Sequence, residues 1–154
     1  MENLPEVLVV GVGSDHGDDQ VGWRVVESLW LHPHFAGRAI AVSELTRLIY
    51  QLDGCTQLVI VDACQSGAPV GTITRLAWPD CRIELQHGRS SHGIGVCEAL
   101  RLAEQLGLLP ERVVLLGVEV KSCEPGDELS PAVRRAVDVL VSQVVEDVTE
   151  LQYA

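Results

Sequence analysis

Positive charge is scarce in this sequence. Lysine and arginine together number 11 against 22 aspartates and glutamates, which gives a formal net charge of -11 at neutral pH. A surface of this sign repels the phosphates of nucleic acids and of anionic membrane lipids, so we expect neither as a partner. A basic segment of a partner protein would instead be attracted.

Aromatic residues, long apolar runs and paired cysteines are also lacking. No apolar run reaches the length needed to cross a bilayer, so no membrane insertion is expected. Residues 1–6 have neither the basic nor the apolar region of a signal peptide. The 5 cysteines are odd in number and form no Cys-X-X-Cys pair, which favours reduced thiols. Together these absences predict a cytoplasmic protein.

Aliphatic residues take the place of the missing aromatics. The chain is 47% apolar and rich in valine and leucine, which is typical of a compact α/β protein and not of a disordered chain. Its 154 residues are enough to bury a core without disulfide bonds or structural metals. We therefore expect a single domain over residues 1–154.

The segment around which the chain is organised comes near its start. Residues 7–10 form a continuous apolar run, which predicts a strand buried on both faces. A glycine-rich turn follows, and then an amphipathic helix that ends near residues 32–33. Asp18 and Asp19 fall at the helix start, where carboxylates can cap free amides. They are either caps or part of a site, because open α/β sheets bind ligands beyond the carboxyl ends of their strands.

Buried runs and turn residues place the remaining elements. The connection between the apolar strand 58–61 and the next strand is too short for a helical crossover, so we expect these two strands to pair antiparallel. Further along, residues 119–128 read as a polar loop. The expected fold is α/β, a three-layer α/β/α sandwich around a mixed, mostly parallel sheet of about five strands. The pattern predicts strands at 38–43, 58–61, 71–78 and 113–118, and helices at 45–52, 92–106 and from 131 onward.

Three polar residues stand at element ends that such a fold gathers on one edge. Asp19 follows the first strand, Asp62 ends the third, and His92 opens a helix. Two carboxylates and one imidazole suit a divalent metal and leave open positions for water or substrate. Taken singly, each residue has a plainer interpretation, since aspartate often forms turns and histidine is often a surface residue.

Competing motifs predict less. Residues 11–16 resemble a dinucleotide-binding turn, but histidine replaces the last glycine and two acids follow, where phosphates would be unfavourable. The sequence has neither a Walker lysine nor a Gly-X-Ser-X-Gly elbow. His16 and His87 are alternative ligands, although solvated loop residues are the commoner case. Cys64 could be a nucleophile near His92, but a small buried apolar role is more usual for such a cysteine.

Five segments, taken together, carry a resemblance that spans nearly the whole chain. In this order and spacing they resemble the hydrogenase maturation endopeptidases. In that family an acidic residue of the first turn, an aspartate after a later strand and a histidine opening a helix bind the metal. The resemblance places these roles on Asp19, Asp62 and His92. The matching segments are VLVVGVGS, GDDQVGWRVVE, LVIVDACQSGAPVGTI, SSHGIGVCEALRLAEQLGLLP and VVLLGVEVKSCEPGDELSPAV.

The resemblance implies an endopeptidase that removes the C-terminal extension of a nickel–iron hydrogenase large-subunit precursor after nickel insertion. The nickel would come with the substrate as the recognition signal, although another divalent metal could occupy the site in isolation. The metal would polarise the scissile carbonyl or activate a water. Asp18 would orient the neighbouring ligand or cap the helix. The alternative is a non-catalytic, metal-dependent chaperone or binding module for the immature subunit.

The sequence departs from the family pattern in three places. Asp19 stands where many members carry glutamate, which keeps the oxygen ligand on a shorter side chain. Residues 69–71 read Pro-Val-Gly where relatives commonly have Pro-Gly, and residues 44–46 read Glu-Leu-Thr in place of a loop rich in Asp, Gly and Thr. Because that loop helps to discriminate partners, the particular hydrogenase served is not predicted.

Overall fold

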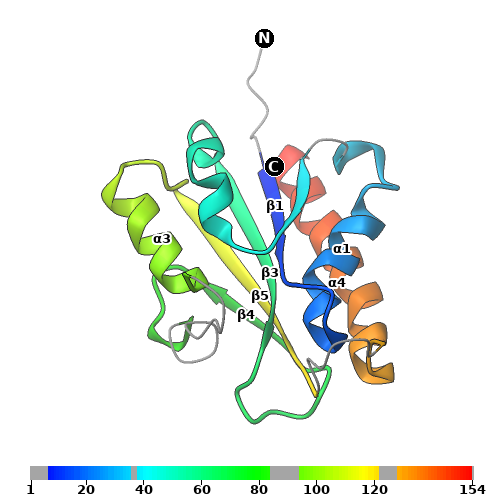
Figure 1. Ribbon diagram of the computed structural model, residues 1–154. Coiled ribbons are helices and arrows are strands. Elements are labelled where there is room, and N and C mark those ends of the chain that lie inside the picture. The colour runs from blue at the N-terminus through cyan, green and yellow to red at the C-terminus, as the bar shows by residue number, and fades with distance from the viewer. Residues whose placement is uncertain (1–6, 36–37, 84–93, 122–127, 154) are drawn as a thin grey trace.

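A mixed sheet forms the middle of the molecule. The computed structural model describes residues 7–35, 38–83, 94–121 and 128–153. Within these residues the strands lie in the order β2-β1-β3-β5-β4, and all neighbours are parallel except β4 and β5 (Figure 1). The predicted mixed, mostly parallel sheet is confirmed. The strands are β1 (Val7–Val12), β2 (Ala39–Val42), β3 (Gln57–Cys64), β4 (Ile73–Ala77) and β5 (Arg112–Glu119).

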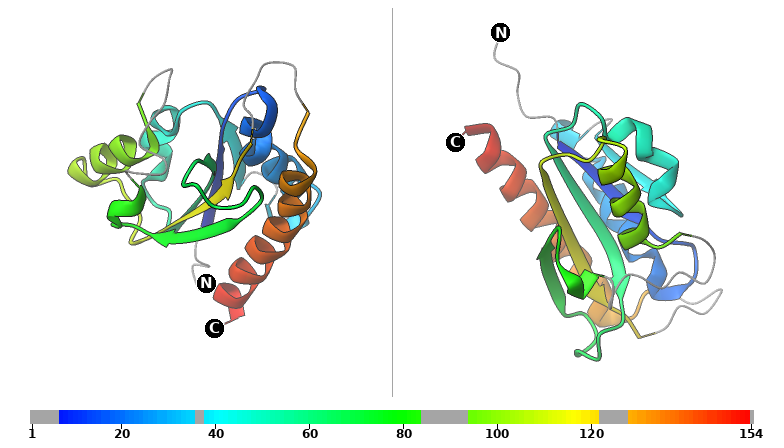
Figure 2. Two further views of the ribbon diagram at one scale, coloured as in Figure 1. Left: turned by 90° about the horizontal axis from the view of Figure 1, so that it is seen from below. Right: turned by 90° about the vertical axis from the view of Figure 1, so that its left-hand side faces the viewer.

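Helices cover both faces of this sheet and complete the predicted three-layer sandwich. One face is covered by α1 (Val21–Leu29) and α4 (Pro131–Tyr153). The other is covered by α3 (Val96–Gln105) and the 3-10 segment η3 (Leu45–Leu52). Figures 1 and 2 show the two layers on opposite sides of the strands. Two short 3-10 turns, η1 (Gly17–Gln20) and η2 (Pro33–Phe35), flank α1. No helix in the described part of the chain is long and apolar enough to cross a membrane.

Alternate side chains of the central strands pack into two separate hydrophobic cores, one on each face of the sheet. In β1, Val9 packs with α1 and α4, whereas Val10 packs with α3 and η3. In β3, Val59 and Ile60 divide in the same way. Because successive side chains of a strand point to opposite faces, a strand covered on both sides must be apolar throughout. This explains why the central strands read as continuous apolar runs.

One expected pairing is wrong. The strands β3 and β4 were predicted to pair with each other, but β4 pairs with β5, which lies between them. The short connection correctly indicated that the chain reverses direction. It could not show that a strand formed later in the chain would take the place beside β3, where all of β5 pairs in parallel register. The result is an antiparallel edge strand on an otherwise parallel sheet.

Helix α1 approaches the sheet closely through two glycines. A Cβ atom added at Gly22 would lie 2.6 Å from the carbonyl oxygen of Val61 and 2.7 Å from that of Val12. One added at Gly11 would lie 2.2 Å from the carbonyl oxygen of Gly22. All of these contacts are with backbone, which cannot move aside as a flexible side chain could. The helix therefore sits at a distance from β1 and β3 that only glycine permits.

We expect Gly22→Ala to destabilise the protein by about 2 kcal/mol, because the added methyl group overpacks the contact between helix and sheet. In an exposed helix the same change would stabilise by about 1 kcal/mol. The sign of the shift in the urea unfolding midpoint therefore tests the close approach. Ser28→Ala in the same helix is the control and should shift the midpoint little. A stabilised Gly22→Ala variant would contradict the packing described.

Candidate active site

The carboxyl ends of the neighbouring strands β1 and β3 lie side by side, and the chain leaves them in opposite directions along the sheet. After β1 the chain passes through α1 to β2, and after β3 it leads to the opposite side of the sheet, towards β4 and β5. Open α/β sheets bind ligands at such a switch point, beyond the carboxyl ends of the strands. In Figure 1 this is the lower edge of the sheet. Asp19 and Asp62 come from these two neighbouring strands, one just after β1 and one near the end of β3.

Asp19 lies in η1 and is partly buried. The hydroxyl of Ser14 donates a 2.6 Å hydrogen bond to its Oδ2 atom. The backbone closes around the same residue, since Ser14 N–H donates to the Asp19 carbonyl at 3.2 Å and Asp19 N–H donates to the His16 carbonyl at 3.0 Å. These bonds fix the direction of the carboxylate. The alternative ligand His16 lies in this turn beside Asp15, with Nε2 at 3.2 Å from Asp15 Oδ1.

Asp62 is a strand residue and not the residue that closes the strand. The strand β3 continues two residues further, to Cys64. Because Leu58 and Ile60 face α3 and η3, the alternation of the strand directs Asp62 to the same side. Its partner in the register of β5 is Gly117, which has no side chain. The neighbouring position on β5 therefore places no side chain beside the Asp62 carboxylate.

The third predicted ligand, His92, lies outside the described residues, as does His87. Helix α3, which follows this segment, begins at Val96 on the same side of the sheet as Asp62. Its last residue precedes the start of β5, so its first turn lies towards the carboxyl edge. Among the residues that the structure describes, no group of three His, Cys, Asp or Glu side chains is arranged to hold a metal. A metal site at this edge thus needs a ligand from elsewhere in the chain or from a substrate.

Asp18 is not a helix cap. The N-cap residues of η1 and α1 are His16 and Gln20, so Asp18 occupies neither cap position, and it is completely buried. Its carboxylate instead accepts hydrogen bonds from the backbone N–H of Lys121 at 2.9 Å, the N–H of Ser130 at 2.7 Å and the hydroxyl of Ser130 at 2.8 Å. The residue therefore joins the turn after β1 to the segments that follow β5 and precede α4.

Glu119 is a second buried carboxylate at this edge, and sequence analysis missed it. It is the last residue of β5 and only 5% exposed. Its oxygens accept hydrogen bonds from Ser66 N–H at 2.9 Å, Ser66 Oγ at 2.8 Å and Gly67 N–H at 3.0 Å. Burial alone would raise the pKa of Glu119, but these hydrogen bonds outweigh it and lower the pKa below its usual value. Glu119 thus remains ionised and anchors the turn after β3.

Cys64 is a structural residue and not a nucleophile. It is 2% exposed, and its thiol lies 3.5 Å from Glu119 Oε2. Burial, followed by the hydrogen bond to Glu119 and the negative charges of Glu119 and Asp62, raises the pKa of Cys64 to about 12. Since the thiolate is the reactive form, this cysteine is inert near neutral pH.

We therefore expect Cys64→Ala to keep the full activity of the native chain once the folded fraction is matched. In the native chain, iodoacetamide should modify the exposed Cys81 and leave Cys64 unmodified. Peptide mass mapping after a short labelling pulse measures both sites. Folded Cys64→Ala without activity would contradict the structural role.

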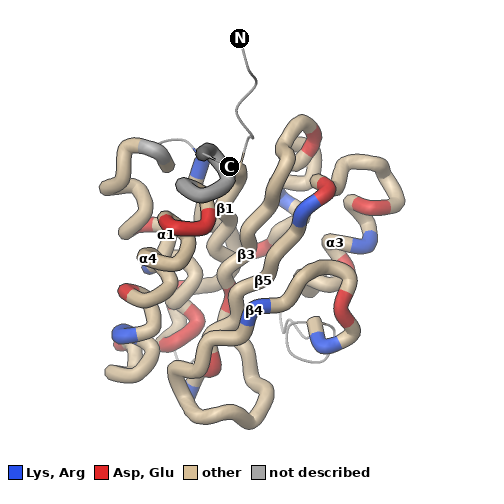
Figure 3. Tube along the Cα trace, turned by 180° about the vertical axis from the view of Figure 1, so that it is seen from behind, with Lys and Arg blue, Asp and Glu red and all other residues tan. Residues whose placement is uncertain are grey.

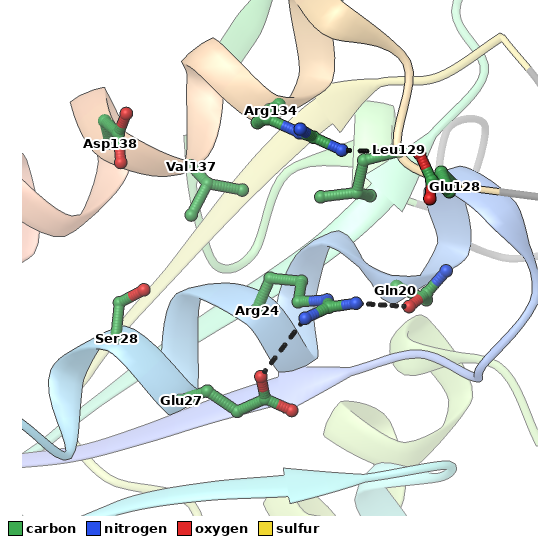
Figure 4. A pocket seen from close by; sticks show the side chains of 9 residues that line it. All are labelled: Gln20, Arg24, Glu27, Ser28, Glu128, Leu129, Arg134, Val137 and Asp138. Carbon is green, nitrogen blue, oxygen red and sulfur yellow. Dashed lines mark hydrogen bonds and ion pairs between the residues drawn. The ribbon is translucent and has the colours of Figure 1, made fainter.

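A cavity of about 400 Å³ lies between α1 and α4, and Asp19 and Asp62 do not line it (Figure 4). Arg24 lies on the α1 wall and contacts its neighbours along the chain, Gln20 at 3.1 Å and Glu27 at 3.7 Å. Arg134 lines the opposite wall, 3.9 Å from Glu128. The cavity therefore holds charges of both signs, each already near an opposite one. Elsewhere the acidic residues are spread along the outer helices (Figure 3).

The fold is that of an open α/β protein, with the carboxylate residues Asp19 and Asp62 near its switch point. A family model described as hydrogenase maturation protease matches residues 43–147. The hydrogenase expression/formation protein HupD of Thiocapsa roseopersicina is 30% identical over 152 residues, covering 95% of this chain and 69% of that protein. The hydrogenase 2 maturation protease of Escherichia coli is 27% identical over 150 residues, covering 94% and 91%.

The solved structures agree. The hydrogenase maturating endopeptidase HybD from Escherichia coli superposes with a TM-score of 0.78 at 25% identity, covering 94% of this chain and 93% of that one. A hydrogenase 2 maturation peptidase from a thaumarchaeote superposes with a TM-score of 0.69 at 29% identity, covering 94% and 98%. The chain belongs to the hydrogenase maturation protease family, and it is an endopeptidase, a hydrolase of peptide bonds.

Proposed function

We propose that this chain removes the C-terminal extension of a nickel–iron hydrogenase large-subunit precursor after nickel has been inserted. The observation that carries the proposal is that Asp19, in the turn after β1, and Asp62, near the end of β3, belong to neighbouring strand ends at the switch point, in a member of a hydrogenase maturation protease family. The cysteines among the described residues are free thiols, which suits action in a reducing cytoplasm.

The metal is part of the substrate in this proposal. Asp19, Asp62 and His92 would complete its coordination, and two oxygen donors with one nitrogen donor suit a divalent transition metal. When bound, the metal would polarise the scissile carbonyl or activate a water. The chain itself supplies the Asp19 carboxylate, which the Ser14 hydroxyl holds by a hydrogen bond, and the Asp62 carboxylate, whose register partner Gly117 has no side chain.

A processing assay tests the proposal. The chain is incubated with nickel-loaded precursor and, in parallel, with the same precursor lacking nickel, and intact mass is followed over time. We expect loss of the C-terminal tail from the loaded precursor alone. Equal cleavage of both forms would refute nickel recognition. Binding of the loaded precursor without cleavage would identify a chaperone and refute the proposed reaction.

A further inference from the structure

We infer that Asp18 is a positioning residue that holds Asp19 in place by fastening the turn after β1 to the chain on both sides of the β5–α4 connection. The inference rests on the proposed function, because it assigns Asp19 to the metal. It adds a residue that acts through Asp19 and touches no substrate itself.

Burial of the Asp18 carboxylate costs free energy that its hydrogen bonds must offset. A carboxylate removed from water is stable only if hydrogen bonds replace its hydration. Asp18 is 0% exposed and accepts bonds from three donors on Lys121 and Ser130. Hydrogen bonds to an ionised acceptor are about twice as strong as neutral ones. The turn is therefore tied firmly to residues 103 and 112 positions further along the chain.

The position of η1 depends on the hydrogen bonds of Asp18 more than the position of β3 does. Asp62 lies within a strand whose register with β5 fixes its backbone. Asp19 lies in a four-residue 3-10 turn, outside every strand pairing. Short 3-10 turns have poorer hydrogen-bond geometry than α-helices and little stability of their own. The position of Asp19 is thus set by Ser14 on one side and by its neighbour Asp18 on the other.

The hydrogen bonds of Asp18 connect three segments of the chain. Lys121 follows β5 and Ser130 precedes α4, so the Asp18 carboxylate joins two points of the chain that lie on either side of the β5–α4 connection. Partners that orient metal ligands in this indirect way typically change metal affinity by about 10- to 100-fold when they are removed. We expect the same scale of loss here.

The test compares Ni²⁺ binding by the full chain and its variants, using calorimetry with free Ni²⁺ as the probe. Asp18→Asn keeps the shape, but its amide nitrogen replaces one of the two oxygens and so leaves the N–H of either Lys121 or Ser130 without its acceptor. Ser130→Ala removes only the hydroxyl bond. Glu27→Gln, an exposed carboxylate-to-amide change in α1, is the matched control. Amide hydrogen exchange at Ser14 and Asp19, whose N–H groups close the turn, provides a readout that needs no metal.

We expect the Ni²⁺ dissociation constant to rise about 10- to 100-fold in Asp18→Asn, by less in Ser130→Ala, and not at all in Glu27→Gln. Exchange at the two turn amides should accelerate in the same order, while the amides of the central strands stay protected. If Asp18→Asn proves unfolded, Ser130→Ala alone must show both effects. A merely structural role would lower stability and leave binding by the folded fraction unchanged.

Two negative results are distinguishable. Native affinity in folded Asp18→Asn, together with weakened binding in Asp19→Asn, would overturn the positioning role and leave the metal site intact. Native affinity in Asp19→Asn itself, or no binding by the native chain, would overturn the metal site and the positioning role together.

Discussion

We expect Asp62→Asn to slow processing of the nickel-loaded precursor by more than about 100-fold. The substitution preserves the size of the side chain but removes its charge and one of its oxygen donors. Loss of a direct ligand should exceed the 10- to 100-fold effect typical of residues that only orient ligands. The strand pairing of residue 62 with Gly117 is backbone only, so the fold should be retained. Single-turnover tail release, followed by intact mass, measures the rate.

Asp53→Asn is the matched control, because this aspartate is exposed and follows η3. It should process the precursor at the native rate. Asp19→Asn should behave as Asp62→Asn does. An Asp62→Asn variant that is folded and retains its rate within a factor of about three would refute a direct role at the metal, since removal of even an orienting group usually costs more.

Glu119→Gln should destabilise the protein by about 3 kcal/mol. The carboxylate accepts bonds from three donors on Ser66 and Gly67, and an amide can accept with its oxygen only. The amide oxygen could keep the two N–H bonds made to Oε1, but the Ser66 hydroxyl would have to accept from the amide nitrogen, and every bond would lose the negative charge that strengthens it; a hydrogen bond to a charged group contributes about 1.5–3 kcal/mol. Urea unfolding measures the change. Glu104→Gln, which alters an exposed partner of Trp78, should cost well under about 1 kcal/mol.

The lowered pKa of Glu119 also predicts how stability changes at acidic pH. Because the folded pKa of Glu119 is lowered, its contribution to stability is present above the ordinary value of 4.5 and is lost as pH falls through the folded pKa. The free energy of unfolding of the native chain should therefore fall below about pH 4.5, and that of Glu119→Gln should fall less. Parallel curves for the two proteins would contradict an ionised Glu119 in the folded state.

Much of the fold could be predicted from the sequence, because each central strand is buried on both faces. Runs such as residues 7–10 and 58–61 can be recognised without knowing their neighbours. The order of the strands in the sheet could not be predicted in this way, since it depends on which strands lie side by side in the folded chain. The prediction for β4 failed for this reason. The helix expected at 45–52 is present as the 3-10 segment η3.

The site was predicted unevenly, and the reasons are physical. Asp19 and Asp62 stand out because each is an acid close behind a buried apolar run of the sequence, 7–10 or 58–61, where open α/β sheets place their ligand sites. Glu119 carries the same signal, an acid at the end of the apolar strand 113–118, but was assigned to a polar loop. Asp18 was interpreted as a cap because its partners, Lys121 and Ser130, lie more than a hundred residues away, and a local pattern contains no trace of them.

The most direct test is the anomalous scattering of a nickel-soaked crystal of this chain, recorded on both sides of the nickel absorption edge. We predict one nickel peak at the carboxyl edge of the sheet, about 2 Å from oxygens of Asp19 and Asp62 and from a nitrogen of His92. A well-occupied peak elsewhere, or a His92 side chain directed away from the two carboxylates, would contradict the site on which the proposed reaction depends.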